Sequence, residues 1–176
     1  MTPDLHFAGY SSHEAPPNDP LRTKWNAVRP SLYSAPMPSM PFDIAIENQR
    51  INSDIKYTPE LQGDDEWQTP AQTWESRKGD CEDYAIVKYA ALLKSGMPED
   101  HLRLVVGEIK SAMRNNPAHA WCAAYLNGNW CALDNKFVKI IRVKDYINWI
   151  PVAAMHGSSV VRYGSEFTMA EMMRVK

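Results

Sequence analysis

The stretch KGDCEDYAIVKYAALLKSG, residues 78–96, places one cysteine between two acids at the start of a predicted helix. Asp80 is a favourable N-cap residue, and Asp83, three positions later, completes a pattern that resembles a capping box. The residues that follow leave little polar surface, and Gly96 suits the position just after the last turn. The sequence therefore predicts a central, largely buried helix over 81–95.

Beyond this helix the hydrophobic pattern changes from a helical to a strand-like period. Asn127 and Gly128 form a strong signal for a two-residue hairpin turn. Strands are predicted over 102–109, 119–126, 129–134, 137–143 and 149–155. Helices followed by a run of antiparallel strands indicate an α+β fold, in which the cysteine-bearing helix packs on an antiparallel sheet.

The N-terminal region is rich in proline, because residues 1–41 hold eight of the 13 prolines of the chain. Such a segment cannot sustain long regular structure, so it is predicted to be an arm with one short helix near residues 21–28. The sequence then predicts one folded domain over 42–165 and a C-terminal tail over 166–176.

Two further helices are predicted between the arm and the central helix. Residues 42–57 form a helix whose Phe42, Ile46 and Ile51 are expected to face inward. Residues 58–79 are polar and interrupted by proline and glycine, with a short helix after Thr69.

The overall composition limits the classes of function. A chain of 176 residues with 44% hydrophobic residues can bury one core. A net charge of −2 gives no reason to expect binding to nucleic acid. No apolar run approaches the roughly 18 residues that span a bilayer, so direct membrane insertion is not expected. The N-terminus lacks the pattern of a signal peptide. We therefore expect an exported protein if a signal peptide was removed, and a cytoplasmic one if Met1 is the natural start.

The hairpin turn predicts which side chains share a face of the sheet. With Asn127 and Gly128 as the loop residues, Trp121 lies opposite Asp134, and His119 lies diagonally from Asp134 on the same face. The Cα atoms of His119 and Asp134 are then about 7–8 Å apart, within reach of their side chains.

The two other cysteines are expected on the opposite face of the hairpin. Cys122 and Cys131 are not directly paired across the two strands, so we predict two core thiols and no disulfide. A zinc site that combines these cysteines with His119 is excluded, because the histidine points to the other face.

An imidazole beside a carboxylate is the orienting half of a nucleophilic triad. Cys81, at the N-terminus of the central helix, would supply the nucleophile, since the helix dipole favours a thiolate there. This holds provided that the neighbouring acids, Asp80 and Glu82, point away from the sulfur.

An oxyanion would be stabilised by the backbone N–H of Cys81, and by an indole N–H of Trp67 or Trp74.

Each member of the triad also has an ordinary structural explanation. Taken singly, Cys81 is more often a small buried residue, His119 a satisfied histidine, and Asp134 a turn residue. The conjunction of the three favours catalysis.

The sequence contains the motif GDCEDYAIVKYAALLKSGMP, with AHAW and ALDN after it and INSDIKY and DEWQTP before it. In these segments the sequence resembles the bacterial transglutaminase-like cysteine peptidases, the LapG-type periplasmic proteases. The resemblance covers about residues 42–140 and implies a transglutaminase-like or papain-like core. It implies that Cys81 is the nucleophile, His119 the general base and acid, and Asp134 the orienting carboxylate.

The resemblance also implies a calcium site. In that family the acids beside the cysteine bind Ca²⁺, and the matching residues here are Asp80 and Glu82, with Asp83 a less certain member. Hard oxygen ligands suit this ion, whose charge would offset the effect of the acids on the sulfur. The alternative is that Asp80 only caps the helix and that the other two acids complement its dipole.

The family cleaves the N-terminal region of large cell-surface adhesins between small residues, which releases cells from biofilms. A membrane-bound cyclic-di-GMP receptor sequesters these proteases. The resemblance therefore implies a protein substrate of the adhesin class and a receptor partner. Two alternatives stay open: acyl transfer to an amine by the same triad, as in transglutaminases and amidases, and a non-catalytic, calcium-responsive binding module.

Overall fold

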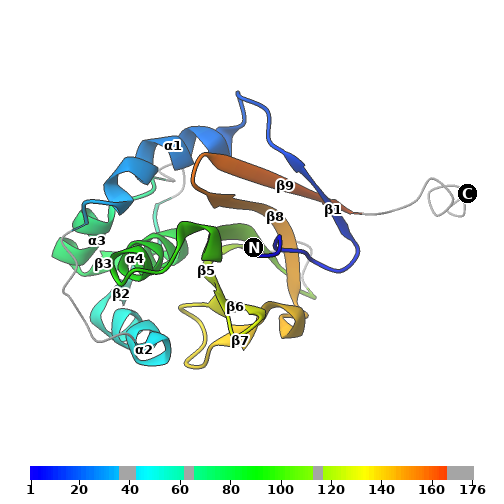
Figure 1. Cartoon of the computed structure of the whole chain (residues 1–176). Helices are drawn as coiled ribbons and strands as arrows, with labels where there is room; N and C mark the ends of the chain where they lie inside the picture. Colours follow the sequence, from blue (N-terminus) through cyan, green and yellow to red (C-terminus); the bar gives the residue numbers. More distant parts are fainter. Residues whose placement is uncertain (36–42, 62–65, 113–116, 166–176) are drawn as a thin grey trace, which may run out of the picture.

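A seven-stranded antiparallel sheet dominates the computed structural model, which describes residues 1–35, 43–61, 66–112 and 117–165 (Figure 1). Over these residues the strand order is β1-β9-β8-β4-β5-β6-β7. The strands are β1 (Tyr10–Glu14), β4 (Leu102–Ile109), β5 (Ala118–Leu126), β6 (Asn129–Leu133), β7 (Ile141–Arg142), β8 (Trp149–His156) and β9 (Ser159–Ser165).

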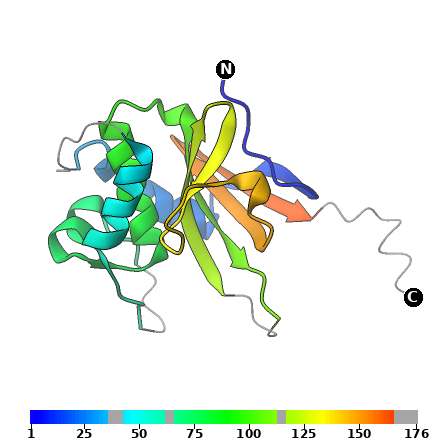
Figure 2. The same ribbon diagram turned by 90° about the horizontal axis from the view of Figure 1, so that it is seen from below.

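The helices gather on one side of this sheet, as two perpendicular views show (Figures 1 and 2). They are α1 (Pro20–Leu32), α2 (Ile44–Asp54), α3 (Pro70–Ser76) and α4 (Cys81–Lys94). Two short 3₁₀ turns, η1 (Glu99–His101) and η2 (Val143–Asp145), and a small parallel pair, β2 (Lys56–Tyr57) and β3 (Lys78–Gly79), complete the described elements.

Helix α4 is the central, buried helix that the sequence predicts. Every residue from Glu82 to Leu92 is buried. It packs against β5 and β4, where the main hydrophobic cluster includes Leu104, Cys122 and Ala124. The helix therefore places its first residue, Cys81, beside β4 and β5, two inner strands of the sheet.

The opposite face of the sheet is covered by the N-terminal segment. Leu5 is buried there in a second cluster that contains Trp121 and Trp149, and Phe7 packs against that cluster. The hydroxyl of Tyr163 donates a hydrogen bond of 2.8 Å to the carbonyl of Leu5. Both faces of the sheet are thus buried.

The proline-rich region contributes more regular structure than the sequence predicts. Strand β1 pairs with β9 at the edge of the main sheet, and α1 has 13 residues rather than one or two turns. Pro20 is tolerated at the start of α1, where no intrahelical N–H bond is lost. The expectation of an arm with only one short helix is therefore wrong. The predicted boundary at residue 41 and the predicted tail over 166–176 lie outside the described residues.

The two helices predicted between the N-terminal region and α4 are present, but one predicted inward-facing residue is exposed. Ile51 is buried as expected, but Ile46 is 60% exposed, so its inward placement is wrong. Helix α2 begins at Ile44 after its cap and is shorter than predicted, which leaves Ile46 in the first turn, away from α4. Phe42 lies outside the described residues. The short helix after Thr69 is present, with Thr69 and Gln72 forming a capping box.

The predicted strands and the hairpin register are largely confirmed. Leu126 pairs with Asn129 and Cys122 with Leu133, as the two-residue turn requires. The strand expected over 137–143 is only Ile141–Arg142, because the chain bends at residues 138–139 before it and turns into the 3₁₀ helix η2 directly after it. Strand β9 was not predicted. All three cysteines are free, and Cys122 and Cys131 are buried, as expected.

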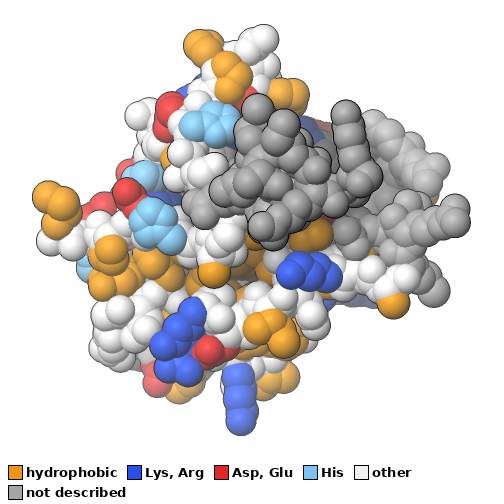
Figure 3. All heavy atoms as spheres, turned by 90° about the vertical axis from the view of Figure 1, so that its right-hand side faces the viewer, with side chains coloured by type: hydrophobic (Ala, Val, Ile, Leu, Met, Phe, Trp, Pro, Cys, Tyr) orange, Lys and Arg blue, Asp and Glu red, His pale blue; other side chains and the backbone are white. Residues whose placement is uncertain are grey.

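Within the described part of the chain, no helix is long and apolar enough to span a membrane. On the face seen in Figure 3, basic side chains of the described residues are interspersed with acidic and hydrophobic ones, so positive charge is not concentrated there.

Candidate active site

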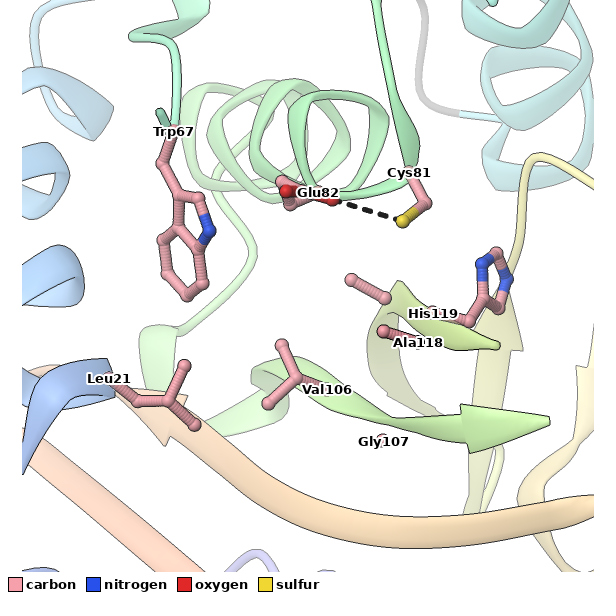
Figure 4. A pocket seen from close by; sticks show the side chains of 9 residues that line it. Leu21, Trp67, Cys81, Glu82, Val106, Gly107, Ala118 and His119 are labelled. Atoms are coloured by element: carbon pink, nitrogen blue, oxygen red, sulfur yellow. Dashed lines mark hydrogen bonds between the residues drawn. The ribbon is translucent and has the colours of Figure 1, made fainter. Parts of the chain in front are cut away.

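Cys81 opens helix α4 and lines a pocket of about 140 Å³. The lining residues come from α1, the segment before α3, α4, β4 and β5: Leu21, Trp67, Cys81, Glu82, Val106, Gly107, Ala118, His119 and Ala120. Figure 4 shows Cys81 and His119 on one side of this pocket and the indole of Trp67 on the other. The pocket therefore brings a thiol and an imidazole to a site with an apolar wall.

The thiol of Cys81 donates a hydrogen bond of 3.0 Å to Oε2 of Glu82 (Figure 4). The sequence analysis required Glu82 to point away from the sulfur, and this expectation is wrong. Burial and the Glu82 carboxylate raise the pKa of the thiol well above its ordinary value, and the backbone N–H of Ala120 acts against this rise. The Cys81 side chain therefore contacts the carboxylate of Glu82 and lies beside the backbone of Ala120, next to His119.

His119 contacts Asp134 as the hairpin register predicts. Its Nε2 lies 2.9 Å from both carboxylate oxygens of Asp134. Both side chains are almost fully buried, with residue exposures of 3% for His119 and 1% for Asp134. A buried carboxylate that accepts the Nε2–H of an imidazole leaves Nδ1 for another partner.

Asp134 is held by two further donors. The backbone N–H of Lys136 donates to Oδ1 at 2.9 Å, and the hydroxyl of Tyr146 donates to Oδ2 at 2.8 Å. Burial acts to raise the pKa of Asp134, but the hydrogen bond and charge of His119 and these two donors lower it overall. Asp134 is therefore fixed as a carboxylate.

Aromatic side chains pack around His119 and Asp134. The rings of Trp149 and His119 meet edge to face with centroids 6.2 Å apart, and Tyr146 stacks on Trp121. The sequence analysis did not single out Tyr146 or Trp149. Their aromatic type gives no local signal, because long-range strand pairing and the η2 turn bring them to His119 and Asp134.

The structure separates the two tryptophans proposed for the oxyanion. Trp67 lines the pocket. Trp74 is absent from the pocket lining among the described residues, and its ring instead lies under the guanidinium groups of Arg77 and Arg50, at 3.8 and 4.9 Å from the ring centroid. Cation–π contacts thus hold Trp74 elsewhere, and only Trp67 is available to a group bound in the pocket.

Asp83 serves the backbone around the start of α4. Its Oδ1 accepts the N–H of Gln68 at 2.9 Å, and its Oδ2 accepts the N–H of Asp80 at 3.2 Å. Burial raises the pKa of this carboxyl to about 7. Asp83 is therefore engaged as a capping residue, which agrees better with the structural alternative than with metal ligation.

Asp80 and Glu82 have the character of cation ligands. Oδ1 of Asp80 is buried without a hydrogen-bond partner among the described residues. Burial, together with the nearby Asp80 carboxylate, raises the pKa of Glu82 to about 7. Two crowded carboxylates with a free oxygen fit a calcium ion, although the described residues contain no group of three potential side-chain ligands.

Comparisons with known proteins identify the family and the fold of the chain. A family model described as the transglutaminase-like superfamily matches residues 43–135, which include Cys81, His119 and Asp134. No curated protein matches the chain significantly.

Solved structures show the same fold. The chain is similar to calcium-bound Legionella pneumophila LapG, with 24% identity, a TM-score of 0.58, and coverage of 88% of this chain and 90% of that chain. It is similar to EGTA-treated LapG of the same organism, with 23% identity, a TM-score of 0.58, and coverage of 88% and 89%. The predicted transglutaminase-like α+β fold is confirmed. The match over more than half of its residues shows that the chain belongs to the transglutaminase-like superfamily.

Proposed function

We propose that the protein is a calcium-dependent cysteine endopeptidase whose triad is Cys81, His119 and Asp134. The observation that carries the proposal is the buried contact of 2.9 Å between His119 and Asp134, beside a pocket that His119 shares with Cys81. The family and the fold support a cysteine peptidase.

In the proposed reaction Asp134 holds Nε2 of His119, so that Nδ1 accepts the thiol proton of Cys81. The sulfur then attacks the carbonyl carbon of a peptide bond in the pocket. The resulting oxyanion accepts hydrogen bonds from the backbone N–H of Cys81 and from the indole N–H of Trp67. His119 returns the proton to the leaving amine, and a water molecule, deprotonated by the same imidazole, hydrolyses the thioester.

The contact between Cys81 and Glu82 opposes the first step, because a neighbouring carboxylate disfavours the thiolate. Asp80 and Glu82 are the residues that would hold calcium, and the bound ion would supply positive charge that favours a thiolate beside it. Calcium binding by LapG, whose calcium-bound and EGTA-treated forms share this fold, supports the assignment.

We further propose a substrate and a setting from the family resemblance. The substrate is the N-terminal region of a large surface adhesin, cut between small residues to control biofilm release, and the location is the periplasm. A membrane-bound cyclic-di-GMP receptor would sequester the enzyme. The narrow apolar pocket around Leu21, Trp67 and Val106 suits a small substrate side chain.

The decisive experiment incubates wild type and Cys81→Ala with adhesin N-terminal fragments, with calcium or with EGTA. We expect cleavage only by wild type with calcium. Cys131→Ala is the matched control, because it removes a buried thiol outside the pocket lining. Cleavage by Cys81→Ala at the wild-type rate would refute the proposal.

Mass spectrometry of the products separates hydrolysis from acyl transfer. With a primary amine added to the reaction, hydrolysis yields free carboxyl termini, whereas transfer yields amides of the added amine. A predominance of amide products would replace the endopeptidase by an acyltransferase.

A further inference from the structure

Lys88 is a buried lysine whose presence the proposed reaction does not explain. It lies in the middle of α4, is only 1% exposed, and is absent from the described pocket lining. An apolar side chain would be favoured at such a position, since burying an amine costs free energy unless it has partners. The contacts of Lys88 therefore indicate the structural role of its amine.

The amine reaches the end of strand β6. Nζ of Lys88 donates a hydrogen bond of 3.4 Å to the carbonyl of Leu133, the residue before Asp134. Burial lowers the pKa of Lys88 to about 7, while the charges of Asp134 and Cys122 act to raise it. An amine donates hydrogen bonds in either protonation state, so this contact persists whether or not Lys88 is charged.

A second helix reaches the next carbonyl. Nδ2 of Asn52, in α2, donates a hydrogen bond of 3.1 Å to the carbonyl of Asp134 and a longer one of 3.5 Å to that of Phe137. Asn52 lies in the segment INSDIKY, residues 51–57, for which the sequence predicts a helix but no part in the site. Two donors from two helices thus hold consecutive carbonyls, those of Leu133 and Asp134.

These two donors bind the backbone at the end of strand β6. Leu133 is the last residue of β6 in the register with β5, and Asp134 follows it outside the strand. A residue just beyond a strand end lacks the ladder bonds that fix its neighbours. At this point the backbone carbonyls of Leu133 and Asp134 accept hydrogen bonds from the side chains of Lys88 and Asn52.

We propose that Lys88 and Asn52 are positioning residues that clamp the backbone of Leu133 and Asp134, and so hold the carboxylate against His119. This inference rests on the proposed function, because it matters to catalysis only if Asp134 orients His119. Neither residue touches the pocket, so their effect on the reaction would pass through Asp134.

The test measures alkylation of Cys81 by iodoacetamide near neutral pH with calcium chloride present, followed at the peptide level, so that no substrate is needed. The variants are Lys88→Met, which keeps the length of the side chain, and Asn52→Asp, which keeps its shape but removes the donor. Lys94→Met, an exposed lysine at the end of the same helix, is the control. Each change is also combined with Asp134→Asn, and the melting temperature of every variant is recorded.

We expect Lys88→Met and Asn52→Asp each to slow the alkylation of Cys81 by about tenfold in the wild-type background. In the Asp134→Asn background, each change should slow alkylation little further, because both act through Asp134. A structural defect unrelated to Asp134 would instead slow both backgrounds equally. Imidazole ¹⁵N chemical shifts of His119 provide a second readout, because a displaced carboxylate no longer fixes the proton on Nε2. Both variants should show mixed tautomers, and Lys94→Met should match wild type.

The outcomes separate the two proposals. If Asp134→Asn slows alkylation but both clamp variants behave like wild type, or if their effects multiply with that of Asp134→Asn, the clamp is refuted and the proposed triad stands. If Asp134→Asn itself leaves alkylation and the imidazole tautomer unchanged, the proposed triad fails, and the clamp has no catalytic role to serve.

Discussion

The hydroxyl of Tyr146 donates a hydrogen bond of 2.8 Å to Oδ2 of Asp134, on the side of the sheet away from α4. Tyr146 follows the η2 turn, 12 residues after Asp134. The carboxylate is therefore supported from a segment that contributes nothing to the pocket lining among the described residues.

Replacing Tyr146 by Phe should lower both stability and activity. A hydrogen bond to a charged group contributes roughly 1.5–3 kcal/mol, so we expect the free energy of unfolding at pH 7 to fall by about 2 kcal/mol. The folded-state pKa of Asp134 is lowered, so its contribution is present above its ordinary pKa and is lost as the pH falls. Urea unfolding should therefore show a smaller difference from wild type below about pH 4. Tyr125→Phe, near the hairpin turn, is the control, and an equal loss in both variants would contradict the prediction.

Asp134→Asn should lower kcat by a factor on the order of 10² to 10⁴, because the amide no longer fixes the imidazole tautomer. Steady-state cleavage kinetics measure the effect, and circular dichroism should show an unchanged fold. An Asn variant with kcat within twofold of wild type would remove Asp134 from the proposed triad.

Chelation of calcium by EGTA should abolish cleavage and lower the melting temperature, because a ligand that binds only the folded state stabilises it. Differential scanning fluorimetry over a calcium titration measures this. Glu82→Gln keeps the side-chain shape but loses a proposed ligand charge, so its calcium response should be much weaker than that of wild type. Glu75→Gln, on the exposed side of α3, should respond like wild type. A melting temperature insensitive to calcium in wild type would remove the calcium assignment.

The pair formed by Asp19 and Arg162 should hold the N-terminal region to the sheet. Asp19 caps α1 by accepting the N–H of Leu21 at 2.8 Å and receives bonds of 2.7 and 2.8 Å from the guanidinium of Arg162. We expect Asp19→Ala to lower the free energy of unfolding at pH 7 by about 2–3 kcal/mol, from a lost cap and lost charged hydrogen bonds.

The pH dependence of this loss follows from the Asp19 carboxylate. Arg162 lowers its pKa, so its contribution is complete above its ordinary pKa, near 4, and disappears as the pH falls through the lowered value. Asp19→Ser keeps a capping oxygen without the charge and should lose less than Asp19→Ala. Equal stability losses at pH 7 and pH 2 would count against the ion pair.

Gly79→Ala should disturb the start of α4. An added Cβ would lie 2.6 Å from Cβ of Asp83, closer than packed atoms allow. We expect a loss of about 1–3 kcal/mol in the free energy of unfolding, typical of overpacking. The control is Gly164→Ala, where an added Cβ would lie 3.9 Å from Oγ of Ser11, an ordinary contact. A Gly79→Ala protein as stable as this control would contradict the packing argument.

The elements that the sequence predicts well are those with strong local signals. The capped helix α4 and the Asn127–Gly128 hairpin needed no distant information, and the hairpin register was enough to bring His119 to Asp134. Strands β1 and β9 were missed because β1 is short and mostly exposed, so it lacks the alternation that reveals a strand, and its pairing joins the two ends of the chain.

Within the site, the sequence could not show which way an acid points. Glu82 turns to the sulfur and Asp83 turns to two backbone N–H groups, although both occupy the first turn of the same helix. Likewise, the guanidinium of Arg50 in α2 lies over the ring of Trp74 in α3, a contact between separate helices that the sequence does not reveal. Side-chain direction at a crowded helix start depends on tertiary neighbours, and these are not encoded in the spacing of the motif.

The two margins of the main sheet bear on how the molecule behaves at high concentration. One margin is β1, whose side chains after Tyr10 are all exposed and include His13 and Glu14, and the other is β7, only two residues long. Short or polar outer strands are poor templates for the addition of strands from other molecules. The protein should consequently resist edge-to-edge aggregation, even though both faces of its sheet are rich in apolar side chains.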